Sequence, residues 1–348
     1  MRKTFGIALK VRVFLNVESG LVRLLFVGDI MLGRLVNEML RGRSAQYPWG
    51  DTLPVFRDAD FRMGNLECVL SDYGAPWSAT PKVFRFRSDS KNAAVLKAAG
   101  LDAVSLANNH TLDFGYEALF EMLKILDQYG IAHAGAGEND EKASRSSVID
   151  QKATKVGIIA FTDNEPEWEA TDEKPGIFYV PVDGQDRRAQ RLFQIVGRAR
   201  GKADLLIVSA HWGPNWGYRP QPKHIPFAHA LIDAGADIVY GHSCHVFQGV
   251  EIYKGRPIFY STGNFVDDYA VDEIERNDES FIFIVEIKDG TLKKLWLYPT
   301  VIESFQARLA ASDRARAIAE KMKRVSEGFG TIFVWDKTKG CLSWVMRD

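Results

Sequence analysis

The feature that most constrains the fold is a series of short apolar segments, separated by segments of helical pattern. Apolar segments of strand length cover 21–29, 61–65, 101–107, 155–161, 203–210, 236–241, 256–262, 281–287 and 292–299. Amphipathic helical patterns lie between several of them, at roughly 35–41, 90–99, 115–129, 185–200 and 223–234. Strands that alternate with helices predict an α/β architecture.

Five of these segments run directly into side chains that bind metals. The residues at or just beyond their ends are Asp29, Glu67, the run Asn108, Asn109 and His110, then His211, and finally His242 with His245. In α/β sheets, sites are built at the carboxyl ends of strands. Asp29 alone would be explained as a helix cap, and His211 alone as a core histidine. All five together predict a site for divalent metal ions, because carboxylates, amides and imidazoles are their usual ligands.

The segment YGHSCH (240–245) needs separate treatment because its histidines are three residues apart. On an extended strand such residues face opposite sides, so convergence on one ion requires a turn, which Gly241 permits. A zinc finger would require a second Cys/His pair at short spacing, and the sequence has none. A reactive Cys244 thiol beside imidazolium is a further alternative. Whether His242 and His245 contact the same ion stays open.

Composition excludes several classes of function. The 348 residues carry 44 Lys and Arg against 45 Asp and Glu, so no basic surface for nucleic acid is expected. The sequence has no run of about 18 apolar residues, so no membrane-spanning helix is expected. The three cysteines indicate a reducing compartment, and we expect a cytoplasmic protein. The N-terminal 20 residues do not match a signal peptide, since Lys10 and Arg12 interrupt their apolar run.

Six ordered motifs resemble those of the CapA family, the proteins of poly-γ-glutamate capsule synthesis. They are GDIMLGR (28–34), GNLE (64–67), ANNH followed by DFG (107–110 and 113–115), HWG (211–213), GHSCHVFQGVE (241–251) and STGNF (261–265). That family in turn resembles the calcineurin-like metallophosphoesterases. The resemblance covers roughly residues 22–300. It implies a layered α/β/β/α sandwich of mixed sheets, with a metal site at the C-terminal ends of the strands.

The resemblance also implies roles for individual residues. The implied metal ligands are Asp29, Glu67 as a bridging carboxylate, Asn109, His211, His242 and His245, with His110 as the catalytic histidine near the leaving group. Two departures matter. Met31 stands where metallophosphoesterases have a histidine in Asp-x-His, and the closing motif is His-x-x-His instead of His-x-His. We therefore expect one or two divalent ions of Mn, Fe or Zn.

The expected chemistry is hydrolysis by metal-activated water, with His110 as general acid. The expected substrate is an anionic small molecule or polymer, bound by Arg34, Asn108, Trp212 and Asn264. Three functions remain open from the sequence. The first is a phosphoester hydrolase. The second is a hydrolase or transferase acting on γ-glutamyl or other amide bonds. The third is a non-catalytic binding partner in a polymer-synthesis complex.

The chain is predicted to have one main domain at 22–301. Residues 1–21 are expected to form an N-terminal extension. Residues 302–348 are expected to form an appendage, with a charged helix over 304–327 followed by a terminal pair of strands.

Overall fold

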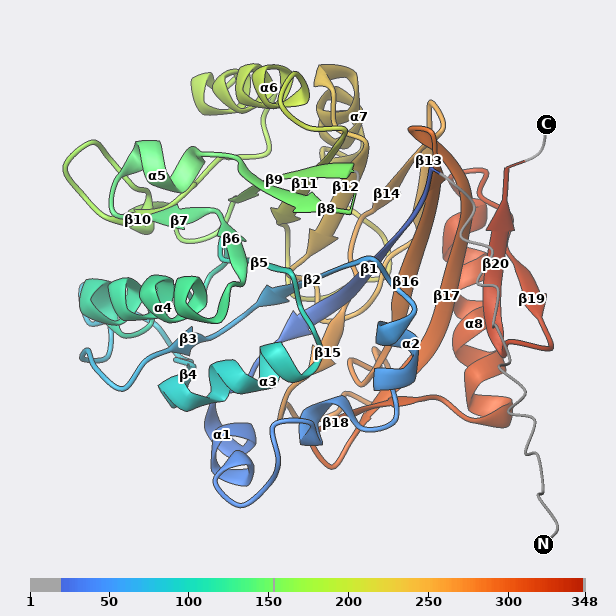
Figure 1. Ribbon diagram of the computed structural model, residues 1–348, viewed down its shortest axis with the longest axis horizontal. Helices are drawn as coiled ribbons and strands as arrows, with labels where there is room; N and C mark the ends of the chain where they lie inside the picture. Colours follow the sequence, from blue (N-terminus) through green and yellow to red (C-terminus); the bar gives the residue numbers. More distant parts are fainter. Residues whose placement is uncertain (1–19, 153, 347–348) are drawn as a thin grey trace, which may run out of the picture.

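Two β-sheets packed face to face form the centre of the computed structural model, which describes residues 20–152 and 154–346 (Figure 1). The large sheet has the order β19-β20-β17-β16-β1-β2-β5-β6, with β15 beside β1 and β18 beside β17. Its strands are β1 (Leu21–Ile30), β2 (Phe61–Leu66), β5 (Ala103–Ser105), β6 (Ala132–Ala134), β15 (Asn264–Val266), β16 (Glu279–Lys288), β17 (Thr291–Glu303), β18 (Gln306–Leu309), β19 (Val334–Asp336) and β20 (Cys341–Val345).

The second sheet has the order β13-β14-β12-β11-β9-β8. It contains β8 (Ser147–Gln151), β9 (Thr154–Thr162), β11 (Leu205–His211), β12 (Ile238–His242), β13 (Val250–Tyr253) and β14 (Arg256–Phe259). Two short pairs join β3 (Val69–Leu70) to β4 (Arg87–Ser88), and β7 (Ala136–Gly137) to β10 (Gly176–Ile177).

Helices pack around the two sheets. They are α1 (Arg34–Leu40), α2 (Leu53–Arg57), α3 (Ala93–Ala98), α4 (Gly115–Tyr129), α5 (Asp140–Ser144), α6 (Arg187–Arg200), α7 (His224–Ala234) and α8 (Ser312–Glu327), with short 3₁₀ turns at Tyr47–Trp49, Ser90–Asn92 and Pro166–Trp168. Apolar residues of α3 and α4 pack on the large sheet, and those of α6 and α7 pack on the small one. The order α/β/β/α confirms the predicted sandwich.

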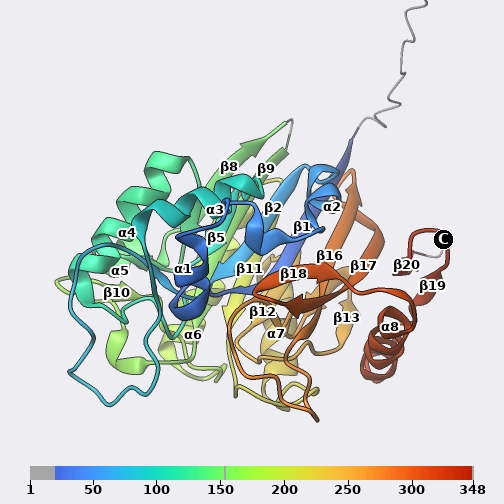
Figure 2. The same cartoon turned by 90° about the horizontal axis from the view of Figure 1, so that it is seen from below.

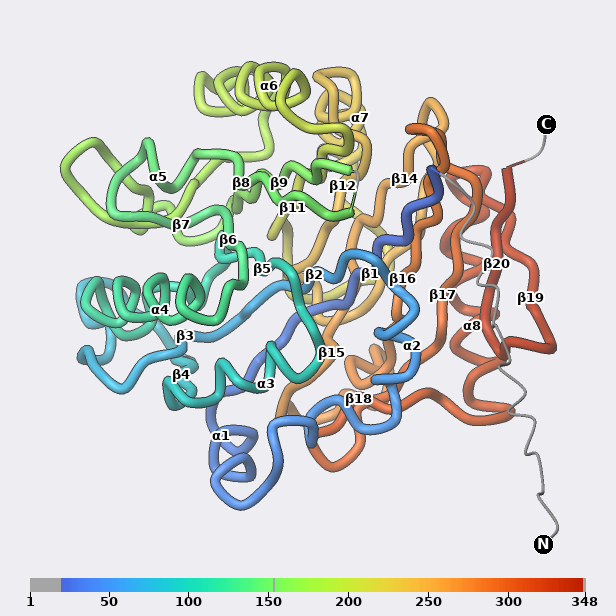
Figure 3. Tube along the Cα trace, in the orientation of Figure 1, coloured from blue at the N-terminus to red at the C-terminus, as the bar shows by residue number. Residues whose placement is uncertain are grey.

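Strand β1 lies at the centre of the large sheet, between β2 and β16 (Figure 3). Its side chains alternate between two apolar cores: Leu24 and Phe26 face the small sheet, whereas Leu25 and Val27 face the helices. Burial on both faces explains why this segment reads as a continuous apolar run. The hydroxyl of Tyr240 on β12 donates to the carbonyl oxygen of Val27, which links the two sheets close to the end of β1.

The C-terminal segment differs from its prediction in one respect. The helix expected over 304–327 begins only at Ser312, because the preceding residues form β18 against β17. The terminal strand pair is present as β19 and β20, and β20 extends the large sheet by pairing with β17. Helix α8 contacts β17, β20 and β13, so it bridges the two sheets at one side of the molecule (Figure 2).

The predicted boundary at residue 301 falls inside β17. The predicted N-terminal extension lies almost entirely outside the described residues, and β1 begins at Leu21. Within the described part of the chain, no helix is long and apolar enough to cross a membrane.

The end of β1 tolerates only glycine at position 28. A Cβ atom at Gly28 would lie 1.8 Å from the carbonyl oxygen of Gly263, in the segment that leads into β15. We expect Gly28→Ala to lower the free energy of unfolding by about 2–3 kcal/mol, the upper range for overpacking. Gly184→Ala is the matched control, since nothing lies within 4 Å of its added Cβ. Urea titration of both variants measures the difference, and equal midpoints would refute this account of β1 packing.

Candidate metal centre

The carboxyl ends of four strands, two from each sheet, supply the side chains of the candidate metal centre. β1 and β2 are parallel, with Asp29 opposite Asn65, and β11 and β12 are parallel, with His211 opposite His242. The pairing of β1 with β2 and of β11 with β12 therefore sets two rows of polar side chains against each other. Ligand atoms of Asp29, His211 and His242 all lie within 4.8 Å of one another.

The contacts within this group join the two sheets. The Nδ1 atoms of His211 and His242 are 2.8 Å apart, and His242 Nδ1 lies 3.8 Å from Asp29 Oδ1. Each histidine is held from its other nitrogen: His211 Nε2 lies 3.0 Å from Asn109 Oδ1, and His242 Nε2 lies 2.8 Å from Ser209 Oγ. These contacts fix the orientation of both rings.

Burial determines the charge state of these groups. Loss of solvation lowers the pKa of His242 to about 3 and that of His211 well below its usual range, the latter helped by the neighbouring histidines. Burial also raises the pKa of Asp29 to about 7, against hydrogen bonds from Asn65 and the backbone of Ser243. Neutral imidazoles are the form that binds metal ions.

Glu67 brings a second carboxylate to Asp29. The two side chains contact each other, and burial and the charge of Asp29 raise the pKa of Glu67 well above its usual range. Asp29 Oδ2 and Glu67 Oε2 are both buried and have no hydrogen-bond partner in the described structure. Buried carboxylates are normally paired or bound to metals. The donor set of carboxylates, imidazoles and an amide oxygen therefore fits a divalent cation.

The predicted run Asn108, Asn109 and His110 follows β5, and its three side chains make different contacts. Asn108 is fully buried and donates to Asn65 Oδ1 at 3.0 Å and to the Leu66 carbonyl, so it supports β2 from inside. Asn109 faces His211. The Nδ1 atom of His110 lies 2.6 Å from Asp113 Oδ2.

His110 forms part of a pocket wall, where its ring stacks on Phe86 at 3.9 Å between centroids. Burial lowers the pKa of His110, and the charge of Asp113 opposes this shift. The Asp113 contact is therefore what favours a protonated ring at this position.

The turn after β12 separates the two histidines of YGHSCH. Ser243 has φ 99°, a left-handed conformation unusual for a residue with a side chain, and it redirects the chain after His242. His245 consequently lies outside the compact group of three. Its Nδ1 atom is 3.1 Å from Asn264 Oδ1, and its ring packs edge-on against Trp216. The Cys244 thiol is buried, and burial raises its pKa to about 12, which removes its thiolate character.

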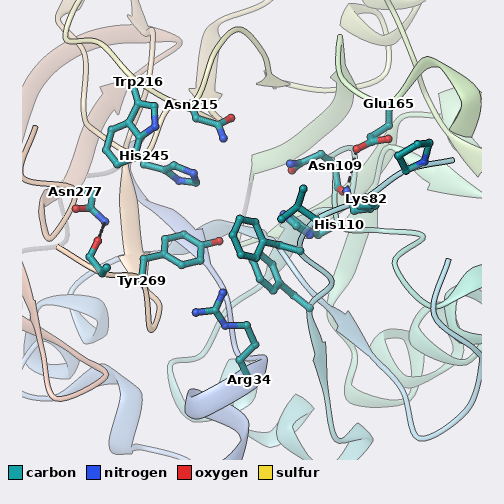
Figure 4. Close-up of a pocket in the computed structure, with 15 residues that line it drawn as sticks. Arg34, Lys82, Asn109, His110, Glu165, Asn215, Trp216, His245, Tyr269 and Asn277 are labelled. Carbon is teal, nitrogen blue, oxygen red and sulfur yellow. Dashed lines mark hydrogen bonds and ion pairs between the residues drawn. The ribbon is translucent and has the colours of Figure 1, made fainter. Parts of the chain in front are cut away.

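A pocket of about 700 Å³ opens beside this centre, with His245 and Trp216 on one side and Asn109, His110 and Lys82 on the other (Figure 4). Tyr269 and Arg34 form a third side. The Lys82 ammonium group is nearly buried, 2.9 Å from Glu165 and 3.5 Å from Asp113.

Both cations of the pocket wall have carboxylate partners. Two nitrogens of the Arg34 guanidinium contact the two oxygens of Asp268, at 3.1 and 2.9 Å. Lys82 bonds Glu165, as above. The positive charges that the pocket presents to an anionic substrate are therefore already partly balanced by these carboxylates.

Of the four residues expected to bind substrate, Arg34 lines the pocket and Asn264 contacts His245. Asn108 is buried beneath the centre. Trp212 lies in the core, stacked on His224 at 4.9 Å, with its Nε1 donating to the Tyr260 carbonyl. The tryptophan that does line the pocket is Trp216.

Several residues of the site were not identified from the sequence. They are Asn65, Lys82, Asp113, Glu165, Asp267 and Tyr269. Strand alternation would have found Asn65, since it lies two residues before Glu67 and so on the same face. Lys82 and Glu165 sit on loops and carry no periodic signal.

Comparison with known proteins assigns the family. Residues 23–269 match the model of the bacterial capsule synthesis protein PGA_cap. The chain belongs to this family. It is 30% identical to a protein of Mycobacterium tuberculosis named "Probable polyglutamine synthesis accessory protein", covering 89% of this chain and 92% of that protein. It is 29% identical to the capsule biosynthesis protein CapA of Bacillus anthracis, covering 89% and 75%. The resemblance to the CapA family is thereby confirmed.

Solved structures support the fold of this PGA_cap family member. A phosphatase from Mycoplasma pneumoniae superposes with a TM-score of 0.51 at 14% identity, covering 81% of this chain and 94% of that one. A hypothetical protein from Thermus thermophilus gives 0.50 at 15% identity, covering 80% and 98%. These similarities establish a shared metallophosphatase-like architecture.

The raised pKa of Asp29 predicts a pH-dependent stability of the chelator-treated protein. The folded chain binds a proton at Asp29 up to about pH 7, whereas the unfolded chain loses it near 3.8. Stability from this group is therefore present at low pH and lost as the pH rises from about 4 to 7. We expect metal-free Asp29→Asn to gain free energy of unfolding relative to wild type at pH 8 but not at pH 4. Denaturant titrations at both pH values test this, and a constant difference would contradict it.

Proposed function

We propose that this PGA_cap family member is a metal-dependent hydrolase that acts on a phosphoester. The observation that carries the proposal is the compact group of Asp29, His211 and His242 beside an open pocket that contains His110. The cavity of about 700 Å³ reaches this group through Asn109, which lines it and contacts His211. Among the described residues, Asp29 Oδ2 and Glu67 Oε2 are buried without a hydrogen-bond partner, which is unusual for a purely structural cluster. Pockets that hold perturbed titratable groups are the usual location of active sites.

The residues proposed to hold the metal are those predicted from the sequence: Asp29, Glu67, Asn109, His211, His242 and His245. When bound, a divalent ion of Mn, Fe or Zn type supplies a water of lowered pKa and polarises the substrate oxygen. Burial keeps the imidazoles neutral and so ready to bind it. Ser209 orients His242, and Asn65 orients Asp29.

A side chain of the protein is proposed to protonate the leaving group. His110 is proposed as the general acid, because its ring is on the pocket wall and its Nδ1 atom is held by Asp113. Because Nδ1 is engaged by Asp113, Nε2 is the ring atom that would transfer the proton. The Asp113 carboxylate also accepts from the Phe86 backbone N–H at 2.6 Å, which prevents it from rotating away.

The pocket wall favours an anionic group with an organic remainder. Arg34 and Lys82 provide positive charge, and both are prepaired with carboxylates, which holds them in place. Phe84, Trp216 and Tyr269 add apolar surface around the opening. A phosphoester has an anionic group that would bind the metal and the two cationic side chains. It also has a carbon skeleton that would pack on the aromatic wall.

An amide substrate is the second candidate. The names of the relatives refer to capsule biosynthesis and to polyglutamine synthesis, which favours an amide bond as the reacting group. The resemblance to the CapA family implies a γ-glutamyl bond. The same metal centre would serve that hydrolysis or a transfer reaction. A non-catalytic partner in a polymer-synthesis complex is the third candidate, with the pocket used for binding only. A cytoplasmic location, expected from cysteine usage, remains a prediction.

The first test is metal content. We expect His211→Ala to lower the affinity for Mn²⁺ by more than about tenfold, at least the effect of losing an outer contact of a metal ligand. Elemental analysis of purified protein and calorimetric titration with Mn²⁺ measure this. His133→Gln is the control, since His133 pairs with Asp127 in a separate pocket. A folded His211→Ala protein with unchanged metal content would exclude His211 as a ligand.

The second test separates chemistry from binding. We expect His110→Gln to keep its metal and to lose about 10²–10⁴-fold in kcat, the usual range for a general acid. Phosphomonoesters, phosphodiesters and γ-glutamyl amides should be assayed side by side with the metal-loaded protein. Turnover of esters alone supports the proposal, and turnover of amides alone supports the second candidate. Binding without turnover of any of them would support the third.

A further inference from the structure

The wall of the pocket beside His110 is aromatic. The ring of Phe86 stacks on the His110 ring with 3.9 Å between centroids, and Phe84 stacks on Phe86 at 6.4 Å. Tyr269 also packs on Phe86, at 5.7 Å. Phe86 is buried, whereas Phe84 lines the pocket and is 59% exposed. A group that lies next to His110 therefore has ring carbons as its neighbours on this side of the pocket.

The Arg34 guanidinium belongs to the same wall. Its central carbon lies 5.8, 5.4 and 5.7 Å from the ring centroids of Phe84, Phe86 and Tyr269. Two of its nitrogens contact the two carboxylate oxygens of Asp268. Aromatic rings and a carboxylate of the protein thus already share the positive charge of this side chain.

The rest of the wall has no surplus positive charge. Arg34 and Lys82 are the two lysine or arginine side chains that line the pocket in the described structure. Asp268 pairs with Arg34, and Glu165 and Asp113 lie 2.9 and 3.5 Å from Lys82. Two cations therefore face three carboxylates. A second anionic group on a ligand would lose its water without gaining an unpaired cation, which costs free energy.

Exposed apolar side chains gather at the opening of the pocket. Val83 lines it, and so does Trp216, which is also exposed. Val271 follows the lining residue Ala270, and Ile274 belongs to the same loop. Val83 and Ile274 are the most exposed large apolar side chains of the described residues, at 86% and 87%. Single exposed apolar residues are normal, but several around one opening mark a binding surface.

The size of the cavity shows where the bulk of a ligand would lie. A volume of about 700 Å³ is in the range of pockets that hold drug-sized molecules, and a phosphate group fills only a small part of it. As the proposed general acid, His110 donates its proton to the oxygen that joins the alcohol to phosphorus. The alcohol part of the ester therefore lies next to Phe86 and Phe84, on the aromatic side of the pocket (Figure 4).

We propose that the substrate is a phosphoester of a neutral, apolar alcohol, with the phosphate as its single anionic group, and that Phe84 is a specificity-determining residue that holds this alcohol. The inference rests on the proposed hydrolase and names its substrate class. In the reaction, the bond between phosphorus and the ester oxygen breaks. Water supplies the new oxygen on phosphorus and loses a proton, and His110 gives a proton to the departing oxygen. The alcohol leaves uncharged.

The test compares four phosphomonoesters of primary alcohols, whose leaving oxygens are similar. They are benzyl phosphate, hexyl phosphate, glycerol 1-phosphate and phosphoglycolate, and kcat/KM is measured with the Mn²⁺-loaded protein. The benzyl and hexyl esters should exceed glycerol 1-phosphate by at least about tenfold, because each buried methylene group contributes about fourfold. Phosphoglycolate should be the poorest substrate, since its carboxylate is a second anionic group.

Variants of Phe84 test its role in this preference. Phe84→Ala should lower the ratio of hexyl to glycerol ester by at least about fivefold, whereas Phe84→Leu, which keeps apolar surface, should retain most of it. Phe120→Ala is the matched control, because Phe120 is an exposed ring on α4 that does not line the pocket. It should leave the ratio unchanged. Urea titration of each variant checks that the fold is intact.

The outcomes separate this inference from the proposed function. Equal kcat/KM for the hexyl and glycerol esters, or an unchanged ratio in Phe84→Ala, would overturn the inference and leave the hydrolase intact. Calorimetric titration with the same esters serves if none is turned over. A binding preference for the apolar esters that Phe84→Ala abolishes would then refute the hydrolase and keep the ligand class. Neither turnover nor binding of any ester would refute both.

Discussion

The contact between two sheets at the ends of β1 and β12 is the constraint on which the rest of the site depends. Asp29 comes from the large sheet, whereas His211 and His242 come from the small one, and their ligand atoms meet within 4.8 Å. The hydroxyl of Tyr240 bonds the Val27 carbonyl directly beneath them. Any shift of one sheet against the other would separate the carboxylate from the imidazoles, so the packing of the apolar core between the sheets also sets the geometry of the centre.

Burial at this contact shifts the pKa values of the acids and of the bases in opposite directions, and both shifts favour the neutral form. It raises the pKa of the carboxylates and lowers that of the imidazoles, so each group is pushed toward its neutral form. A divalent cation reverses this for the carboxylates and uses the imidazoles as they are. The folded chain without metal therefore carries a destabilised cluster, a cost that metal binding offsets.

The pocket is organised around charged pairs on its walls. Lys82 ties the loop before β4 to Glu165 in the loop after β9, so it joins segments that belong to different sheets. Arg34 is held by Asp268 close to Asp267. The same short stretch, from Asn264 to Tyr269, thus supplies a partner for His245, a buried acid, an arginine partner and an aromatic wall.

Much of this was predictable from local pattern. The apolar segments and their polar ends identified the α/β class and the candidate residues Asp29, Glu67, Asn109, His211 and His242, because strand ends and ligand chemistry are both local properties. Asn108 was identified from the sequence as a residue of the site and was expected to bind substrate. In the structure it is buried and donates to the Leu66 carbonyl of β2. Trp212 was expected at the substrate, but it follows His211 directly, adjacent strand residues face opposite sides, and Trp212 packs in the core.

The sequence by itself determined the positions along the chain of the main strands, the positions of the ligand-type residues and the family. Only the tertiary structure decided which of them meet. Ser243 takes a left-handed conformation that sends His245 away from His242, and no residue type signals that. The register of β15 beside β1 brings Asp267 next to Glu67, although the two residues are far apart in the chain. Such neighbours depend on long-range strand pairing, which no local periodicity records.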